Sequence, residues 1–485
     1  MYESFGLLIE GTWQAAADGA SLEVCSPVTM LPVGAIPAAG SDDIARALEA
    51  AAAGFAKWRE VPAWERAGVL RRTADLIRTR ADTIAILIST ETGKPIAEAR
   101  GETLAAADQF EWYAEEAKRI YGQTIPGRNA NERLSVIYQP VGVCLSLSAW
   151  NFPALLPARK IAAALAAGCA VIARPASEAP GAGLAIGQAL MDAGLLPGAL
   201  NILTGEPGLI SESLIASPVV RKVSLTGSVP VGKKILELCA RGVKRVTMEL
   251  GGHAPVIIHA DADPVAVAQK AAAAKFRNGG QVCISPSRFY AHDSIKAEFE
   301  DAFTTFARTL VVGVGLRDGV TMGPLIRERA LKSALDLVED AKVKGARLLT
   351  GGRRPPEINS GHFLEPTVLT DVPDDARIMS DEPFAPVAPI AGFTDVRDVL
   401  RRANATPFGL AAYVFTNDAA LANLTAEGLE AGMVGINETL LATAEAPFGG
   451  VKESGFGREG GALGILDYLE PKYLRHRLIL KESMA

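Results

Sequence analysis

Three side chains could together carry out covalent chemistry at a carbonyl carbon: a thiol, a carboxylate and an amide. Cys283 follows Gly279 and Gly280, and glycine lets backbone N–H groups approach a bound oxyanion closely. The alternative is that Cys283 is one more small buried hydrophobic residue. Glu249 ends a predicted strand, where it is either an ordinary charge or a general base. Asn151 follows another strand, and it is either a turn residue bonded to its own backbone or an amide donor to an oxyanion.

Short apolar strands that alternate with helices must position these side chains. This alternation predicts a buried parallel sheet with right-handed crossovers, in which ligands bind beyond the carboxyl ends of the strands. The predicted strands are Val141–Leu147, Ala170–Ala173, Leu200–Leu203, Lys222–Leu225 and Arg245–Glu249, and the predicted helices between them are Ala154–Ala167, Gly181–Ala193, Leu209–Ala216 and Val231–Ala240.

One of the strand-to-helix turns is rich in glycine. It runs from Thr226 to Gly232, but Gly227 and Gly232 do not have the spacing of the G-x-G-x-x-G dinucleotide fingerprint. The turn alone is therefore weak support for nucleotide binding, although the helix N-terminus that follows can hold a phosphate.

Length and composition exclude several classes of protein. The chain has 485 residues, which suggests about three domains. With 49 basic and 55 acidic residues, its net charge of −6 argues against a nucleic-acid partner, whose phosphates attract basic proteins. Hydrophobic residues make up 49% and charged residues 21%, which is an ordinary globular mixture and not a disordered one.

Cysteine usage and apolar runs bear on where the protein works. Its five scattered cysteines include no C-x-x-C pair, which favours a reducing compartment, and its five histidines show no metal-ligand spacing. The longest purely apolar run, Ile161–Ala173, is shorter than the ~20 residues of a membrane span. The first residues lack a basic segment typical of a signal peptide. We expect a cytoplasmic protein with no membrane partner and no metal.

Several motifs in a fixed order carry a family resemblance along essentially the whole chain. The chain resembles the NAD(P)-dependent aldehyde dehydrogenase superfamily, and within it the succinate-semialdehyde dehydrogenases most. The motifs are Trp150-Asn151-Phe152-Pro153, Leu225-Thr226-Gly227-Ser228, Glu249-Leu250-Gly251-Gly252, Gly280-Gln281-Val282-Cys283, Glu382-Pro383-Phe384-Ala385-Pro386 and Pro447-Phe448-Gly449-Gly450-Val451-Lys452-Glu453-Ser454-Gly455.

The resemblance implies a mechanism and a fold. Cys283 would attack an aldehyde, Asn151 would hold the oxyanion, and Glu249 would activate the water that hydrolyses the resulting thioester. Lys160 matches a family lysine that supports the asparagine. The implied fold is α/β, with a Rossmann-like cofactor domain, a second α/β catalytic domain and a small β-ribbon arm for oligomerisation.

The resemblance also places the cofactor, NAD or NADP. Arg174 and Ser177 stand where the family usually has lysine and often has glutamate, respectively. Because a guanidinium suits a 2′-phosphate and the carboxylate is missing, the sequence favours NADP, with NAD as the alternative. The residues expected around the cofactor are Trp150, Arg174, Ser177, Gly227, Ser228, Gly232, Leu250, Glu382 and Phe384.

Two arginines favour a substrate with a distal carboxylate, such as succinate semialdehyde. Arg159 and Arg277 match arginines with which succinate-semialdehyde dehydrogenases bind that group, although two ordinary ion-pairing arginines are the alternative. The serine that completes this contact in the family is Ala442 here, with Thr443 beside it as a substitute. Phe152 and Phe448 would complete the substrate pocket.

Other functions remain open at this stage. A dehydrogenase for uncharged aliphatic or aromatic aldehydes is one alternative, and an enzyme that passes the acyl group to coenzyme A is another. A cysteine hydrolase would need a histidine base, and none lies near Cys283 in the sequence. A non-catalytic relative is disfavoured because Cys283, Glu249 and Asn151 occur together.

The domain division is expected to follow the resemblance. Residues 1–120 with 141–250 would bind the cofactor, 251–433 would carry the nucleophile, and 434–465 would return to the cofactor domain. We expect the first 120 residues to be mostly helical. The oligomerisation strands, in 121–140 and 466–485, include the alternating segments Glu132–Gln139 and Tyr473–Leu480, whose exposed edges a partner subunit usually covers, which predicts a homodimer or homotetramer.

Overall fold

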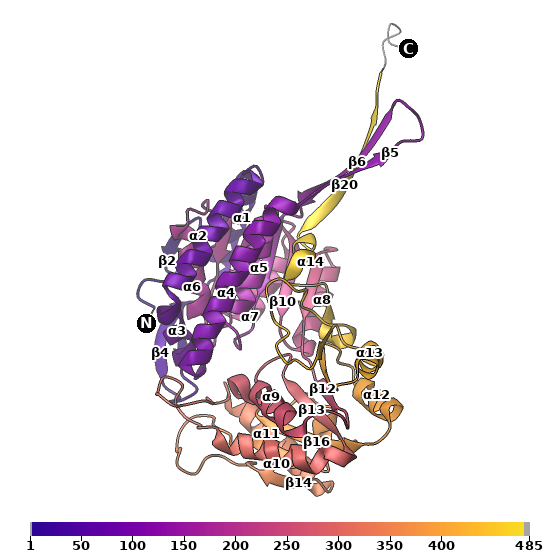
Figure 1. Cartoon of the computed structure of the whole chain (residues 1–485). Helices are drawn as coiled ribbons and strands as arrows, with labels where there is room; N and C mark the ends of the chain where they lie inside the picture. The colour runs from indigo at the N-terminus through magenta and orange to yellow at the C-terminus, as the bar shows by residue number, and fades with distance from the viewer. Residues whose placement is uncertain (1, 480–485) are drawn as a thin grey trace.

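The larger sheet of the computed structural model, which describes residues 2–479, runs through the upper lobe in Figure 1. Its five central strands are parallel, as predicted, while short antiparallel strands extend both edges. In order across the sheet, the strands are β19 (Gly455–Phe456), β11 (Arg245–Glu249), β10 (Val220–Thr226), β7 (Val143–Leu147), β8 (Ala170–Arg174), β9 (Leu200–Ile202), β1 (Leu7–Ile9) and β2 (Thr12–Gln14).

Helices cover both faces of this sheet because successive strand residues point to opposite sides. Val143, Leu145 and Leu147 pack with α1, α7 and α8, whereas Cys144 packs with α2 to α6. These helices are α1 (Ser41–Trp58), α2 (Ala63–Thr79), α3 (Ala81–Thr92), α4 (Ile96–Glu116), α5 (Leu155–Ala167), α6 (Gly181–Asp192), α7 (Pro207–Ala216) and α8 (Val229–Ala240).

The first 120 residues are helical only from Ser41 onward. Before it lie β1 and β2 and a separate two-stranded ribbon, β3 (Ser21–Cys25) and β4 (Pro32–Pro37), which the sequence analysis did not predict. Three-residue strands such as β1 are too short to show a period, and β1 is fixed by pairing with β9, almost 200 residues away.

The second sheet lies in the lower lobe of Figure 1, with α9 and α10 on one face and α11 and α12 on the other. It extends three residues beyond the expected boundary at Met433, to Ile436, before the chain returns to the first sheet through β19. In order across this second sheet, the strands are β14 (Arg347–Thr350), β15 (Thr367–Thr370), β16 (Val387–Phe393), β13 (Pro286–His292), β12 (Ala254–Ile258), β17 (Ala411–Phe415) and β18 (Met433–Ile436).

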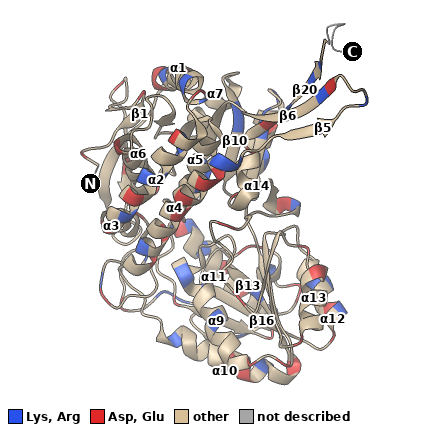
Figure 2. Cartoon of the chain, turned by 45° about the horizontal axis from the view of Figure 1, so that its top comes forward, with Lys and Arg blue, Asp and Glu red and all other residues tan. Residues whose placement is uncertain are grey.

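Charged side chains of both signs are spread over both lobes (Figure 2).

The remaining helices are short or belong to the second lobe. They are α9 (Pro264–Phe276), α10 (Asp293–Thr309), α11 (Glu328–Val343), α12 (Val396–Asn404), α13 (Ala419–Gly428) and α14 (Gly461–Leu466), with single 3-10 turns at Ala117–Arg119, Arg277–Gly280, Arg377–Met379 and Lys452–Ser454. Among residues 2–479, none of the helices combines the length and the apolar composition that crossing a bilayer requires.

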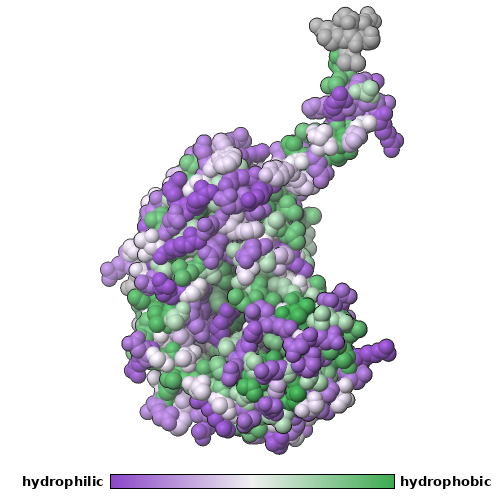
Figure 3. All heavy atoms as spheres, in the orientation of Figure 1, coloured by the Kyte–Doolittle hydropathy of each residue, from purple (hydrophilic) through white to green (hydrophobic). Residues whose placement is uncertain are grey.

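An antiparallel ribbon projects from the body as an arm (Figure 1). It consists of β5 (Gln123–Pro126), β6 (Glu132–Pro140) and β20 (Leu469–Arg477), and β6 pairs with β20 over its whole length. The predicted strand Tyr473–Leu480 corresponds to β20, which begins four residues earlier, at Leu469. The last residue of the predicted segment, Leu480, lies outside the described residues. Hydrophobic residues are visible on the surface of the arm in Figure 3. Ile125 and Ile137 on the arm are each 39% exposed, and Tyr473 is 56% exposed.

Candidate active site

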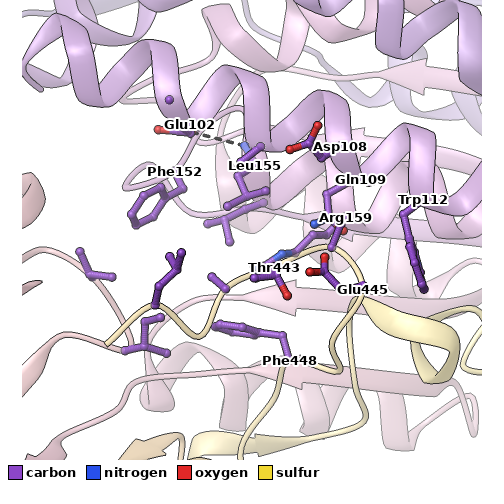
Figure 4. A pocket seen from close by; sticks show the side chains of 18 of the residues that line it. Glu102, Asp108, Gln109, Trp112, Phe152, Leu155, Arg159, Thr443, Glu445 and Phe448 are labelled. Atoms are coloured by element: carbon purple, nitrogen blue, oxygen red, sulfur yellow. Dashed lines mark hydrogen bonds between the residues drawn. The ribbon is translucent and has the colours of Figure 1, made fainter. Parts of the chain in front are cut away.

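Two cavities meet at Cys283. The strand-end cavity, of about 640 Å³, is lined by residues that follow β7, β8, β10 and β11. The helix-side cavity, of about 750 Å³, lies between α4, α5 and the loop from Leu440 to Phe448 (Figure 4). Cys283 lines both. A group bound in one cavity can therefore face a group bound in the other across this thiol.

Glycines make room for the Cys283 loop. Asn278, Gly279 and Gly280 all have positive φ angles, of 51°, 62° and 74°. A Cβ on Gly280 would lie 2.2 Å from the carbonyl oxygen of Ala385, and one on Gly252 would lie 2.5 Å from that of Cys283. These glycines thus permit backbone segments to pack closely, which brings the turn after Glu249 against the thiol.

Glu249 is a buried carboxylate beside the thiol. Its side chain ends β11, and neither of its oxygens has a well-formed hydrogen bond from residues 2–479. Burial raises the pKa of Glu249, and the charge of Glu459 adds to this rise, while the positive charge of Lys160 opposes it. Burial also raises the pKa of Cys283 well above its usual value, and the neighbouring charge of Glu249 raises it further.

Asn151 is held by its backbone and points its amide at the Cys283 loop. Its Nδ2 donates to the carbonyl oxygen of Gln281 at 3.2 Å, and its own carbonyl oxygen accepts from Lys94 and Asn278. The Oδ1 atom is buried without a partner in the described part of the chain. The Asn151 amide therefore contacts the Cys283 loop at Gln281, two residues before the nucleophile.

Lys160 lies beside the site, paired with a residue that the sequence did not indicate. Its fully buried ammonium group forms an ion pair with Glu459, and its support of Asn151 stays a prediction. Glu459 also accepts a hydrogen bond from Ser224 at 3.1 Å. Because Glu459 lies about 300 residues from Lys160 in the chain, no local pattern could reveal this pair.

Most residues expected around a cofactor line the strand-end cavity. Ser177 and Gly232 do not line it, but each contacts a residue that does. Arg174 Nη2 donates to Ser177 Oγ at 2.8 Å, and a Cβ on Gly232 would lie 2.6 Å from the Leu250 side chain. The expected residues that line the cavity are Trp150, Arg174, Gly227, Ser228, Leu250, Glu382 and Phe384.

Two of these lining residues are fixed by specific contacts. Glu382 accepts a hydrogen bond from the N–H of Gly252 at 3.1 Å, and burial raises the pKa of Glu382 to about 8. Phe384 packs edge to face against Trp150, with ring centroids 5.8 Å apart. Ser211, Arg327 and Arg329 also line this cavity, and sequence reasoning missed them because they belong to no motif.

All five residues expected around a substrate line the helix-side cavity: Phe152, Arg159, Arg277, Thr443 and Phe448. Arg159 is 2% exposed and stacks on the Phe448 ring at 4.2 Å. Its Nε and Nη2 atoms have no hydrogen-bond partner between Tyr2 and Ile479, which leaves donors for a ligand.

The second expected arginine, Arg277, is partly exposed and lies over the Phe152 ring, 5.5 Å from its centre. The α4 side chains in this cavity were not predicted. Along α4, Asp108, Gln109 and Trp112 complete the wall, and no sequence motif marks them (Figure 4). In the same described range, no group of three histidine, cysteine or acidic side chains could hold a metal ion.

Comparison with known proteins settles the family. The sequence model of the aldehyde dehydrogenase family matches residues 13–474. The chain belongs to the aldehyde dehydrogenase family. It is 43% identical over 467 residues to the NADP(+) succinate-semialdehyde dehydrogenase GabD of Escherichia coli K12, covering 96% of each chain. It is 43% identical over 466 residues to the glutarate-semialdehyde dehydrogenase of Pseudomonas putida KT2440, again covering 96% of each.

Solved structures agree with this aldehyde dehydrogenase fold. The succinate-semialdehyde dehydrogenase of Burkholderia pseudomallei superposes with a TM-score of 0.96 at 44% identity, covering 98% of both chains. Aldehyde dehydrogenases use NAD or NADP. The strand-end cavity fits such a dinucleotide, because it combines the N-terminus of α8 with a buried, unpartnered Nε atom of Arg174.

The pairing of Cys283 with Glu249 predicts how this aldehyde dehydrogenase reacts with an alkylating reagent. Because Glu249 raises the pKa of Cys283, Glu249→Gln should move the pH profile of Cys283 alkylation to lower pH. Iodoacetamide labelling of Cys283, followed by peptide mass spectrometry in a Cys25→Ser background, measures the profile without the exposed Cys25. Superimposable profiles would show that Glu249 does not act on the thiol.

Proposed function

We propose that this aldehyde dehydrogenase hydrolytically oxidises an aldehyde that carries an anionic group at its far end, with succinate semialdehyde as the best candidate. The observation that carries the proposal is the position of Cys283, between a dinucleotide-sized cavity and a cavity that contains the unpartnered donors of Arg159. Catalysis begins when the Cys283 sulfur attacks the aldehyde carbon and the thiol proton is released to solvent.

The remaining steps use the same small set of residues. The oxyanion formed by this attack accepts hydrogen bonds from Asn151 Nδ2, which leaves the Gln281 carbonyl, and from the N–H of Cys283. Residues of the strand-end cavity such as Arg174, Gly227 and Glu382 would hold NAD(P)+, which would supply the acceptor for the hydride lost from the former aldehyde carbon. Cys283 then holds a thioester. Glu249 takes a proton from water as the water oxygen attacks this thioester, the acid product leaves, and the thiol is restored.

Glu249 favours hydrolysis over transfer to another thiol. A buried carboxylate with a raised pKa beside the nucleophile is a stronger base than an exposed one, which suits it to take a proton from water. Transfer of the acyl group to coenzyme A would need no such base.

Removal of this base should separate the two half-reactions. Mixed with succinate semialdehyde and NADP+, Glu249→Gln should release about one equivalent of NADPH per subunit and then slow at least about 100-fold, because the thioester accumulates. Stopped-flow absorbance at 340 nm measures this burst, and Cys283→Ala should give none. A coenzyme A requirement for wild-type turnover would contradict the hydrolytic assignment.

Both arginines of the helix-side cavity support an anionic substrate. Arg159 is buried with free donors, and Arg277 lies across the same cavity above Phe152. The two curated relatives described above are named for succinate and glutarate semialdehydes, and both of these aldehydes end in a carboxylate. A guanidinium binds such a group through paired hydrogen bonds.

Loss of either arginine should therefore impair binding of charged aldehydes selectively. Arg159→Ala and Arg277→Ala should each raise KM for succinate semialdehyde by about 10-fold or more, with little change for butanal. Steady-state kinetics with both aldehydes measures this, and Arg159→Lys, which keeps the charge without the planar fork, should recover part of the loss. Equal losses on both aldehydes would favour a broad-specificity dehydrogenase.

The strand-end cavity favours NADP over NAD. Burial lowers the pKa of Arg174 only to about 10, so this guanidinium stays charged at neutral pH. Its hydroxyl neighbour, Ser177, brings no carboxylate that would repel a 2′-phosphate. We infer that Arg174 and Ser177 bind the adenosine ribose with its phosphate.

The cofactor assignment is tested by removing the guanidinium. Arg174→Ala should raise KM for NADP+ by about 10-fold or more and leave KM for NAD+ nearly unchanged, because a charge-assisted contact to phosphate is lost. Kinetics with both cofactors at saturating aldehyde measure the ratio, with Arg174→Lys as the charge-conserving control. An unchanged ratio would place the 2′-phosphate elsewhere.

We infer further that the arm joins copies of this chain into a homodimer or homotetramer. A three-stranded ribbon that stands away from the body has little core of its own, and it exposes Tyr473, Ile125 and Ile137. The expected division into a cofactor domain, a catalytic domain and this arm is part of the same proposal. A cytoplasmic setting fits the scattered, unpaired cysteines.

A further inference from the structure

A buried lysine that the proposed mechanism does not use reaches the oxyanion side of the site. Lys94 lies in the turn between α3 and α4, and its side chain is 1% exposed. Its Nζ donates to the backbone carbonyl oxygen of Asn151 at 2.8 Å and forms an ion pair with the equally buried Glu102. The same ammonium lies 4.2 Å from the centre of the Phe152 ring, on the wall of the helix-side cavity.

Glu102 extends this contact to the start of α5. Its Oε1 accepts hydrogen bonds from the backbone N–H groups of Ala154, at 2.8 Å, and Leu155, at 3.3 Å, and Figure 4 shows Glu102 beside Leu155. One ion pair thus holds the backbone at Asn151 and again three and four residues later. The short segment that carries the amide donor is fixed at both ends.

The Cys283 loop donates a second hydrogen bond to the Asn151 carbonyl oxygen. Asn278 Nδ2 donates to the Asn151 oxygen and to the Gln281 oxygen, both at 3.1 Å. Asn151 in turn donates to Gln281. Lys94 and Asn278 thus hold the same Asn151 carbonyl oxygen from two sides. The hydrogen bonds of Asn278 and Asn151 to Gln281 set the distance between the Asn151 amide and the Cys283 loop.

The turn that carries Lys94 is itself tightly held. Ser89 Oγ donates to the Lys94 carbonyl oxygen at 2.6 Å, and Ile96 N–H donates to Gly315 at 2.9 Å. A Cβ on Gly323 would lie 2.1 Å from the Gly93 oxygen. These contacts to the second lobe fix the backbone from which the Lys94 side chain extends, and a positioning role requires such a fixed backbone.

We propose that Lys94 is a positioning residue, which fixes the backbone of Asn151 so that its amide reaches the oxyanion formed at Cys283. The proposal rests on the oxyanion role proposed for Asn151. It differs from a purely structural role, in which the Lys94–Glu102 pair only stabilises the turn. The structural role predicts lost stability, whereas the positioning role predicts a lost rate that depends on Asn151.

A double-mutant cycle separates these roles. Because loss of one partner alone leaves a buried charge, the variant is Lys94→Met with Glu102→Gln, made in the wild-type and Asn151→Ala backgrounds. With Asn151 present, kcat per folded subunit should fall about 10-fold or more, while KM for NADP+ stays within about two-fold. In the Asn151→Ala background the same pair of changes should cost less than about two-fold.

Two single variants complete the test. Lys94→Arg keeps donors for both Asn151 and Glu102 and should retain most of the wild-type kcat. Thr73→Ala removes a buried hydrogen bond to the Val69 carbonyl within α2, outside the Lys94 turn, so it should lower the melting temperature and leave kcat unchanged. Folded subunits are counted by stoichiometric binding of NADPH, which corrects for misfolded protein.

Each remaining outcome overturns the inference. Equal losses with and without Asn151, or an unchanged kcat beside a lower melting temperature, would leave the Lys94–Glu102 pair with a structural role only. Full activity in Asn151→Ala alone would instead overturn the proposed role of Asn151, and the role of Lys94 with it. The two failures are distinguished by that single variant.

Discussion

The constraint on which this structure depends is the burial of a thiol, Cys283, beside a carboxylate, Glu249. Burial raises the pKa of both Cys283 and Glu249. The charge of Glu249 raises the pKa of Cys283 further, and the charge of Glu459 raises that of Glu249 further. The fold must hold this unfavourable pair together. It does so where β11 ends and where the turns of Gly252 and Gly280 allow backbone contacts that a larger residue would prevent.

The same junction explains the two-cavity arrangement. Parallel strands present their carboxyl ends on one edge, which supplies the strand-end cavity, and the helices that cover the sheet supply the other cavity. Two donor sets flank the thiol: Asn151 on the Gln281 side and the free guanidinium atoms of Arg159 in the helix-side cavity. Each of these groups lies at the start or on the buried face of one helix, α5.

Local sequence patterns predicted much of this architecture, whereas the parts that depend on long-range contacts were not predicted. The central strands were predictable because each is a short run with buried apolar residues between helices, and Asn151, Arg174 and Glu249 lie at or just beyond the strand ends. The strands near the N-terminus were not, because β1 and β2 are only three residues long and β1 joins the sheet by pairing with the distant β9. The Lys160–Glu459 pair, Lys94 and Trp112 were missed, because their neighbours come from distant segments.

The most direct test of the central claim is a crystal structure of the Glu249→Gln protein soaked with succinate semialdehyde and NADP+. The account predicts continuous density from the Cys283 sulfur to an acyl group, with the acyl oxygen near Asn151 Nδ2. It places the distal carboxylate at Arg159 and the nicotinamide ring on the opposite side of the sulfur. An unmodified Cys283, or an acyl chain that extends into the strand-end cavity, would contradict it.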